Sequence, residues 1–176
     1  SMLIGNTAPA QVRHVAGSAS MATGGNLVLG RTGGGNGTYN LANTAASGGS
    51  LTGFGQGSGS LTIPAQALVG GQVAASIGTI NIHTSGTLSV GTQLLLGNLG
   101  GTGTVKMDSG TLTVADDFVV GNGAGSTGTF SMSDGTVSKT GAATAVSIGG
   151  GVTVDGGTGT ANLNGGSFST SGVFRV

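Results

Sequence analysis

The sequence predicts an all-β fold: a parallel β-solenoid, or single-stranded β-helix, in which the chain winds in stacked coils of three short strands. Three observations lead to this prediction. A five-residue phrase, Gly-Thr-apolar-x-apolar, returns along the chain; 40 of the 176 residues are glycine; and no segment has the apolar spacing of a helix. Such a repeat indicates a solenoid, because one repeat cannot bury its apolar face until the next repeat stacks on it.

The phrase has the alternation of a half-buried strand. Copies are found at 37–41, 59–63, 78–82, 103–107, 128–132 and 159–163. In the fourth of these, we expect Val105 and Met107 to point inward and Lys106 between them to point to solvent. Each copy of this phrase is therefore predicted to form one of the three strands of its coil.

Two further phrases supply the other strands. The second has the same form and recurs at 86–90, 110–114, 135–138 and 166–169. The third is an apolar run followed by Gly, and it recurs at 3–6, 27–30, 94–98, 118–122 and 146–149. Copies lie about 24 residues apart, so each coil holds three short strands and glycine-rich corners. We expect six to seven right-handed coils, which make a rod about 30 Å long at a strand spacing of about 4.8 Å.

The corners explain the glycines, because a chain that reverses within two or three residues often needs φ above zero, which Gly adopts freely. Asn tolerates the same conformation, which suits Asn98 and Asn122 at equivalent corners. The period breaks at 139–145 and again around 150–155, with about three extra residues in each place. Lys139 falls in an inward slot, and a buried unpaired ammonium is costly. We therefore expect the strand to break there and Lys139 to turn to solvent.

We expect one domain over 1–176, a piece of a larger protein, with regular repeats in 1–41 and 78–176 and irregular coils in 42–77. In the irregular part, Pro64 has no N–H to donate to a strand ladder. The register of those coils is left open.

At 110–135 the phrases follow in the order Gly-Thr-Leu-x-Val, apolar-x-Val-Gly-Asn and Gly-x-Gly-Ser-Thr-Gly-Thr-apolar-x-apolar, closing on Ser-Asp-Gly. This order resembles the repeat shared by type V secretion (autotransporter) passengers and PEP-CTERM surface proteins. Residues 86–110 and 135–166 match it with small changes, 1–41 match it loosely, and 42–77 depart from it. The resemblance implies a segment of a large bacterial exported or surface protein, and it brings no catalytic residues.

Composition argues against several partners. The formal net charge is zero and the five basic residues are scattered, whereas nucleic-acid binding needs clustered Lys and Arg. No run of about 18 apolar residues predicts a membrane span, and residues 1–5 lack the parts of a signal peptide. Cysteine is absent, which excludes disulfides and thiolate metal sites. We expect no cofactor.

His83, Asp108, Ser133 and Asn164 are predicted to form one column, because each directly follows a copy of the first phrase. Stacking then brings His83 close to Asp108. The pair is either a small polar site, such as half of a catalytic pair, or part of a corner column that needs small polar residues. No set of nucleophile, base and orienting residue is evident, so we expect no enzyme. The acidic residues also lack the spacing of a calcium repeat, so we expect no metal site.

Thr residues are predicted to line up along the solenoid. One ladder contains Thr38, Thr79, Thr104, Thr129 and Thr160, and a second file contains Thr102, Thr127 and Thr158. Regular Thr arrays can order water, which is the logic of ice-binding proteins; alternatively, the hydroxyls serve only solubility and strand propensity. We expect the array at a corner rather than along a flat face, which favours the second interpretation.

Glycan-binding surfaces usually stack sugars on exposed Trp or Tyr, and because Trp is absent only Tyr39 remains; Phe118, Phe130 and Phe168 fall in inward slots. The slot of Tyr39 is also inward, so core packing is the competing interpretation. If the ring is exposed, glycan-array binding should survive high salt and fall on Tyr39→Ala.

The fold and the resemblance favour a structural or adhesive segment, a rigid extracellular stalk at the cell surface. A carbohydrate-binding module and an ice-binding protein are the alternatives. Glycans or other surface proteins are the expected partners. Residues 174–176 offer no cap for the edges of the last coil, so we expect either that the chain is cut from a longer one or that chains make end-to-end contact. Any specific activity is expected where the period breaks, at 42–77 or 139–156.

Overall fold

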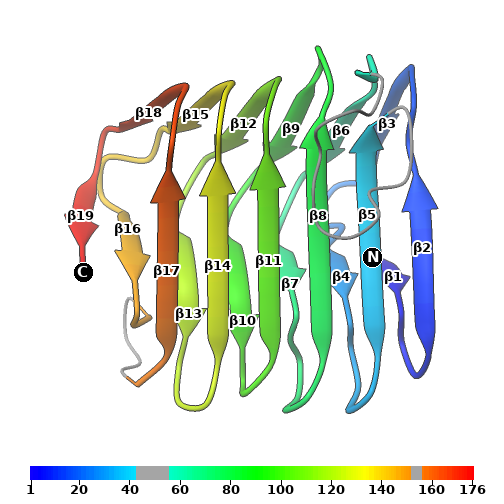
Figure 1. Cartoon of the computed structure of the whole chain (residues 1–176), viewed down its shortest axis with the longest axis vertical. Coiled ribbons are helices and arrows are strands. Elements are labelled where there is room, and N and C mark those ends of the chain that lie inside the picture. Colours follow the sequence, from blue (N-terminus) through cyan, green and yellow to red (C-terminus); the bar gives the residue numbers. More distant parts are fainter. Residues whose placement is uncertain (43–55, 152–155) are drawn as a thin grey trace.

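The computed structural model describes residues 1–42, 56–151 and 156–176, which form a β-solenoid of about six turns with three strands per turn (Figure 1). No helix is found among these residues. The predicted all-β solenoid is therefore confirmed. Residues 43–55 and 152–155, which include part of both irregular stretches, lie outside the described residues.

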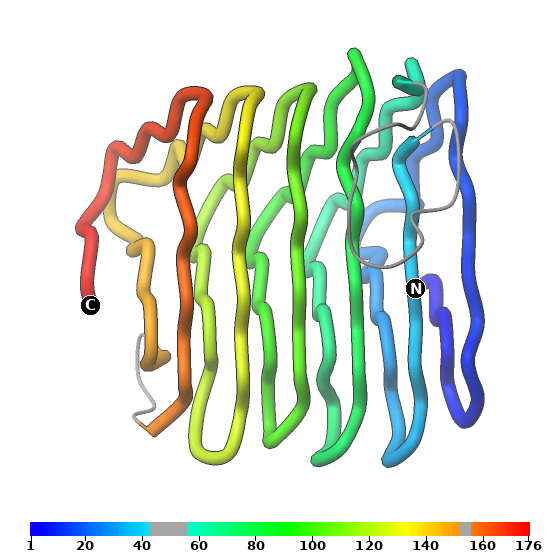
Figure 2. Tube along the Cα trace, in the orientation of Figure 1, coloured from blue at the N-terminus to red at the C-terminus, as the bar shows by residue number. Residues whose placement is uncertain are grey.

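Three parallel sheets make up the solenoid (Figures 1 and 2). Sheet A contains, in spatial order, β1 (Met2–Ile4), β4 (Leu27–Leu29), β7 (Ala67–Val69), β10 (Leu94–Asn98), β13 (Phe118–Asn122), β16 (Ala145–Ile148) and β19 (Val173–Arg175). Sheet B contains β2 (Pro9–Arg13), β5 (Asn36–Ala42), β8 (Ile77–His83), β11 (Thr102–Met107), β14 (Thr127–Met132) and β17 (Thr158–Leu163). Sheet C contains β3 (Ser18–Ser20), β6 (Ser60–Ile63), β9 (Thr87–Val90), β12 (Thr111–Val114), β15 (Thr136–Lys139) and β18 (Ser167–Thr170). The chain visits the three sheets in turn, and Figure 2 shows the coils following one another from the N-terminal to the C-terminal end.

Neighbouring coils pair in the register that the repeat predicts. In sheet B, Val105 of β11 lies beside Ile80 of β8 and Phe130 of β14. All three side chains are buried, whereas the next residue of β11, Lys106, is partly exposed. The predicted inward and outward slots of this strand are therefore confirmed.

One apolar core extends through the coils, from Ile4 to Val146. Phe118 of sheet A meets Phe130 of sheet B edge to face, with ring centroids 5.2 Å apart, and it stacks on Phe168 of sheet C at 6.1 Å. The three sheets thus share one aromatic group in the core. The inward positions predicted for these Phe residues are confirmed.

Sheet A also buries apolar side chains that do not belong to this core. Val28, Leu68, Leu95 and Val119 form a second cluster and are only 1–8% exposed. The strands of sheet A therefore do not alternate between buried and exposed side chains as those of the other two phrases do. The third phrase already indicates this burial on both faces. A run such as 94–96, Leu-Leu-Leu, has no polar position and is typical of a strand buried on both faces.

A glycine follows or ends the apolar run of each of the first six strands of sheet A. These are Gly5, Gly30, Gly70, Gly97, Gly121 and Gly149, with φ between +67 and +84. Positive φ falls on glycine at these six positions, although Ala75 and Leu99 also adopt it, and the same conformation expected for Asn98 and Asn122 is not found. Instead, the Asn122 amide donates to Asn98 Oδ1 at 2.7 Å. These two asparagines tie neighbouring coils together.

One copy of the first phrase, 59–63, lies in a different sheet from the other copies. Its strand β6 pairs with β3 and β9 in sheet C, so it lies beside the second phrase at 86–90 and not beside 78–82. Both phrases have the form Gly-Thr/Ser-apolar-x-apolar, so their pattern alone does not distinguish the sheets. Assigning 59–63 to the first phrase was wrong for this reason.

Lys139 is buried, so the prediction that it turns to solvent is wrong. It ends β15, pairs with Val114 of β12, and is 1% exposed. The extra residues after it are present: Lys139 to Val146 spans 146 − 139 = 7 positions, whereas Val114 to Phe118 spans 118 − 114 = 4. The three additional residues lengthen the corner between sheets C and A.

This longer corner supplies the partners of the buried ammonium. Lys139 Nζ donates to the carbonyl oxygens of Gly141 and Thr144, the second at 2.7 Å. Burial lowers the pKa of Lys139, and the nearby carboxylates of Asp117 and Asp116 oppose that shift. The corner therefore satisfies a charge that the strand pattern alone would leave unpaired.

Candidate functional site

The outer side of sheet B carries a regular array of Thr side chains. In β11, β14 and β17 the sequence Thr-Gly-Thr places two Thr on the same side of each strand, because side chains alternate. In-register pairing aligns them in two files, Thr102, Thr127 and Thr158 in one and Thr38, Thr79, Thr104, Thr129 and Thr160 in the other. We call these eight residues the Thr grid. The two predicted Thr files are confirmed.

The Thr grid lies along a sheet, so the prediction that it sits at a corner is wrong. Thr102 and Thr104 are the first and third residues of β11. Figure 1 shows the strands of sheet B side by side and nearly parallel. The Gly-Thr pattern suggests a corner at Gly103, but this glycine is inside the strand, where a Cβ would lie 2.2 Å from the backbone nitrogen of Gly97. Thr side chains repeat about every 4.8 Å across strands and about every 6.6 Å along them.

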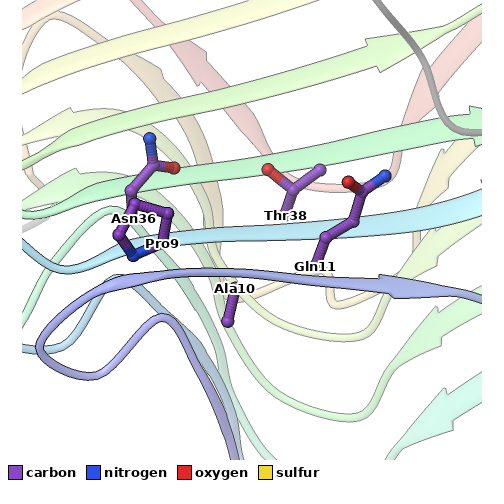
Figure 3. A pocket seen from close by; sticks show the side chains of 5 residues that line it. All are labelled: Pro9, Ala10, Gln11, Asn36 and Thr38. Atoms are coloured by element: carbon purple, nitrogen blue, oxygen red, sulfur yellow. The ribbon is translucent and has the colours of Figure 1, made fainter.

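At the N-terminal end of sheet B the Thr grid meets a shallow hollow of about 270 Å³, lined by Pro9, Ala10, Gln11, Asn36 and Thr38. In Figure 3 the side chains of Pro9 and Gln11 lie on the same side of the ribbons as those of Asn36 and Thr38, and Ala10 points the opposite way. Gln11 pairs with Thr38, so an amide continues the longer Thr file. The role of Gln11 could not be predicted from the sequence, because residues 9–13 lack the phrase.

The column that follows the first phrase brings His83 and Asp108 together, as the spacing predicts. His83 Nδ1 lies 2.5 Å from Asp108 Oδ1, and each side chain is 16% exposed. Ser133 is one coil beyond Asp108, which places its backbone about 10 Å from that of His83 at the usual strand spacing. A nucleophile must lie within hydrogen-bond reach of its base. Ser133 is therefore too distant to pair with His83, and the His83–Asp108 contact joins two neighbouring coils.

Tyr39 is part of the core. It is 3% exposed, and its hydroxyl lies 2.9 Å from His14 Nδ1. Burial raises the pKa of Tyr39 to about 12. A ring in this position cannot stack on a sugar, so the carbohydrate-binding alternative loses the one aromatic residue on which it depended. The substitution Tyr39→Ala would report on core packing instead.

Among the described residues, no group of three or more acidic and His side chains is placed to hold a metal ion. Over 1–42, 56–151 and 156–176, no helix has the length and apolarity needed to cross a membrane. Comparison of the chain with protein family models, with curated proteins and with solved structures gave no match.

Proposed function

We propose that the chain is a rod-shaped structural segment, a stalk of a bacterial surface or autotransporter-like protein. The observation that carries this proposal is the continuity of the solenoid: three sheets share one apolar core that passes from coil to coil. Each coil adds about 4.8 Å along the axis. A rod built in this way fixes the distance between whatever is attached to its two ends.

The use of side chains within the repeat supports a role that depends on shape. In β11, Gly103 allows the close approach to sheet A, Val105 and Met107 fill the core, and the two Thr residues face outward. Few side chains of a coil are left for chemistry. The resemblance of 110–135 to the repeat of exported passengers supports a location outside the cell.

Immunogold labelling of the source cells tests the location. Antibodies raised against the purified chain should label intact cells about as strongly as permeabilised cells, and antibodies against a cytoplasmic protein should label only the permeabilised ones. Labelling by both antibodies only after permeabilisation would contradict the proposal, because a surface stalk has to be accessible from outside.

We propose ice binding as a second candidate, because the Thr grid lies along nearly parallel strands. Hydroxyls and methyl groups at two fixed repeats, about 4.8 Å and about 6.6 Å, offer a template on which a layer of water can be held in a matching order. The shorter Thr file continues onto Ile77, which is 43% exposed, and on its other side the longer file borders on a polar column that contains Lys106.

Substitution within the grid tests this candidate. Thr129→Lys places a long charged side chain between Thr104 and Thr160 and is expected to reduce thermal hysteresis and ice shaping at least about twofold. The matched control is Thr113→Lys, at a partly exposed position of β12 in sheet C; it should leave both readouts unchanged. Absence of hysteresis in the unsubstituted chain, or equal loss in both variants, would contradict ice binding.

A further inference from the structure

We infer that the two ends of sheet B are not equivalent: the edge at β2 is closed against a further coil, whereas the edge at β17 accepts another strand of the repeat. Both strands are outermost in the sheet, and an outermost strand normally offers unpaired N–H and C=O groups to any partner. Three residues close the β2 edge, Pro9, Ala10 and His14. Each departs from the residue type of its column, and each departure opposes stacking on the outer side of β2.

Pro9 removes a hydrogen-bond donor. In the later coils the residue of this column donates its backbone N–H to the coil before it: Ile77 to Gly35 at 2.9 Å, and Thr102 to Ser76 at 2.8 Å. Pro9 occupies the same column through its pairing with Asn36. Proline has no N–H. A coil stacked on the outer side of β2 would therefore leave a carbonyl without its donor.

Ala10 adds a side chain where close approach requires glycine. The other members of its column are Gly37, Gly78, Gly103, Gly128 and Gly159. A Cβ at any of these five would lie 2.0–2.7 Å from the last carbonyl oxygen of the apolar run in sheet A of the preceding coil. The Cβ of Ala10 exists, and Figure 3 shows it directed away from Pro9 and Gln11. It would collide with the backbone of any coil placed there in register.

His14 places a polar ring at the end of the core. It follows Arg13, which pairs with Asn40, so it takes the column of Leu41. Its ring nitrogens lie 2.9 Å from the Tyr39 hydroxyl and 3.1 Å from a backbone carbonyl oxygen. An added coil would bury the imidazole against apolar side chains, whereas a partly exposed ring keeps contact with water.

The opposite end has no residue that opposes a further coil. The Thr158 N–H already donates to the Ser126 carbonyl oxygen of the preceding coil at 2.8 Å, and the missing side chain of Gly159 serves the close approach to that same coil. A coil added beyond β17 would bring its own N–H and its own Gly, and it would meet Leu163 of β17. Leu163 is 47% exposed, and Phe174 of β19 is 48% exposed, so a further coil would bury apolar side chains that are now partly exposed to solvent. The partner that fits is a strand of the same repeat, with Gly in the second position and apolar residues in the fourth and sixth. This asymmetry restricts end-to-end contact to the β17 side.

Adding one coil to either end of the full chain tests the inference. A copy of residues 97–120 joined after Val176 continues the register at the β17 end, and a copy of 94–117 inserted between Ser1 and Met2 continues it at the β2 end. Both copies contain the sequence of β11 with its single Lys, so trypsin reports whether the added strand is docked. We expect the added coil to be cleaved at least about tenfold faster at the β2 end.

Restoring the column residues should open the closed edge. With Pro9→Thr, Ala10→Gly and His14→Leu, cleavage of the coil added before Met2 should slow at least about tenfold. Equal protection of both coils in the unsubstituted chain would overturn the inference, and so would no slowing in the triple variant. Circular dichroism of each variant without the added coil checks the fold, and Ala10→Gly alone repeats the test if the triple variant unfolds. A chain found only inside the cell would contradict the proposed stalk and leave this result unchanged.

Discussion

Gly103→Ala is expected to lower the free energy of unfolding by about 3 kcal/mol or more, at the upper end of the usual cost of overpacking. The added Cβ would lie 2.0 Å from the carbonyl oxygen of Val69 and 2.2 Å from the backbone nitrogen of Gly97. Both atoms belong to the backbone of sheet A, so no side-chain rotation relieves the contact. The strand must shift, and the shift disturbs the ladder hydrogen bonds of two coils.

Urea denaturation followed by circular dichroism measures this loss, and a fall of about 6–12 °C in the thermal midpoint should accompany it. Gly33→Ala is the matched control. Gly33 is exposed, has no positive φ, and its added Cβ would meet only the carbonyl oxygen of Ala74 at 3.6 Å. The control should stay within about 0.5 kcal/mol of the unsubstituted chain. Equal stability of the two variants would contradict the close approach of sheets A and B.

The parts of the fold that depend on periodicity could be predicted from the sequence. Spacing alone placed Val105 and Phe130 in one buried column and brought His83 beside Asp108, because stacked coils convert a separation of about 25 residues into a contact between neighbouring strands. The Thr files follow from the same rule. In-register stacking makes the columns independent of the details of any corner.

The errors arose where local chemistry outweighs the period. Gly103 resembles a corner residue in the sequence, but it lies inside β11, where the backbone of sheet A leaves no room for a side chain. The Thr grid therefore lies along a sheet and not at the predicted corner. The phrase at 59–63 resembles the strands of two sheets equally. Asn98 and Asn122 were assigned a backbone role, but their amides pair side chain to side chain. In each case the residue's position is determined by a contact with another coil, and the neighbouring residues in the sequence do not reveal that contact.

At the closed edge of β2, residues that depart from the repeat have a structural role of their own. Pro9 and Ala10 look like imperfections of a weak repeat when the sequence is aligned by its phrase. Once their columns are known, the missing N–H and the added Cβ both act on the outer side of the same strand. A repeat protein needs end coils that differ from its inner coils, and natural sheets block exposed edges with Pro and charged residues.

Replacement of Lys139 has the second large expected effect. Lys139→Ala removes the four-carbon stem from a core slot and leaves the carbonyls of Gly141 and Thr144 without their donor, so the free energy of unfolding should fall by about 2–5 kcal/mol. Lys139→Met keeps the stem and removes the charge. Met avoids the cavity that Ala leaves, but it also leaves the two carbonyl oxygens without their donor, so its loss should be smaller than that of Ala, about 1–3 kcal/mol at pH 7.

The pH dependence of stability separates the charge from the stem. Burial lowers the pKa of Lys139 from its ordinary value of 10.5. Between the lowered pKa and 10.5 the unfolded chain binds more protons than the folded chain, so the stability of the unsubstituted chain should rise with pH in that interval. Tyr39 acts in the opposite direction: its pKa rises from 10.0 to about 12 on folding, so stability should fall above pH 10.

Urea denaturation from pH 7 to pH 10 therefore isolates Lys139. The unsubstituted chain should gain stability toward pH 10, and the Met variant should show no such gain, because it has no ammonium to deprotonate at this position. Above pH 10 both chains should lose stability together, since both retain Tyr39. If the Met variant gains the same stability toward pH 10, the titrating group is not Lys139. If the Ala variant is as stable as the unsubstituted chain, Lys139 is not buried as described. A gain confined to the unsubstituted chain would mean that the longer corner accommodates the charge at a residual cost.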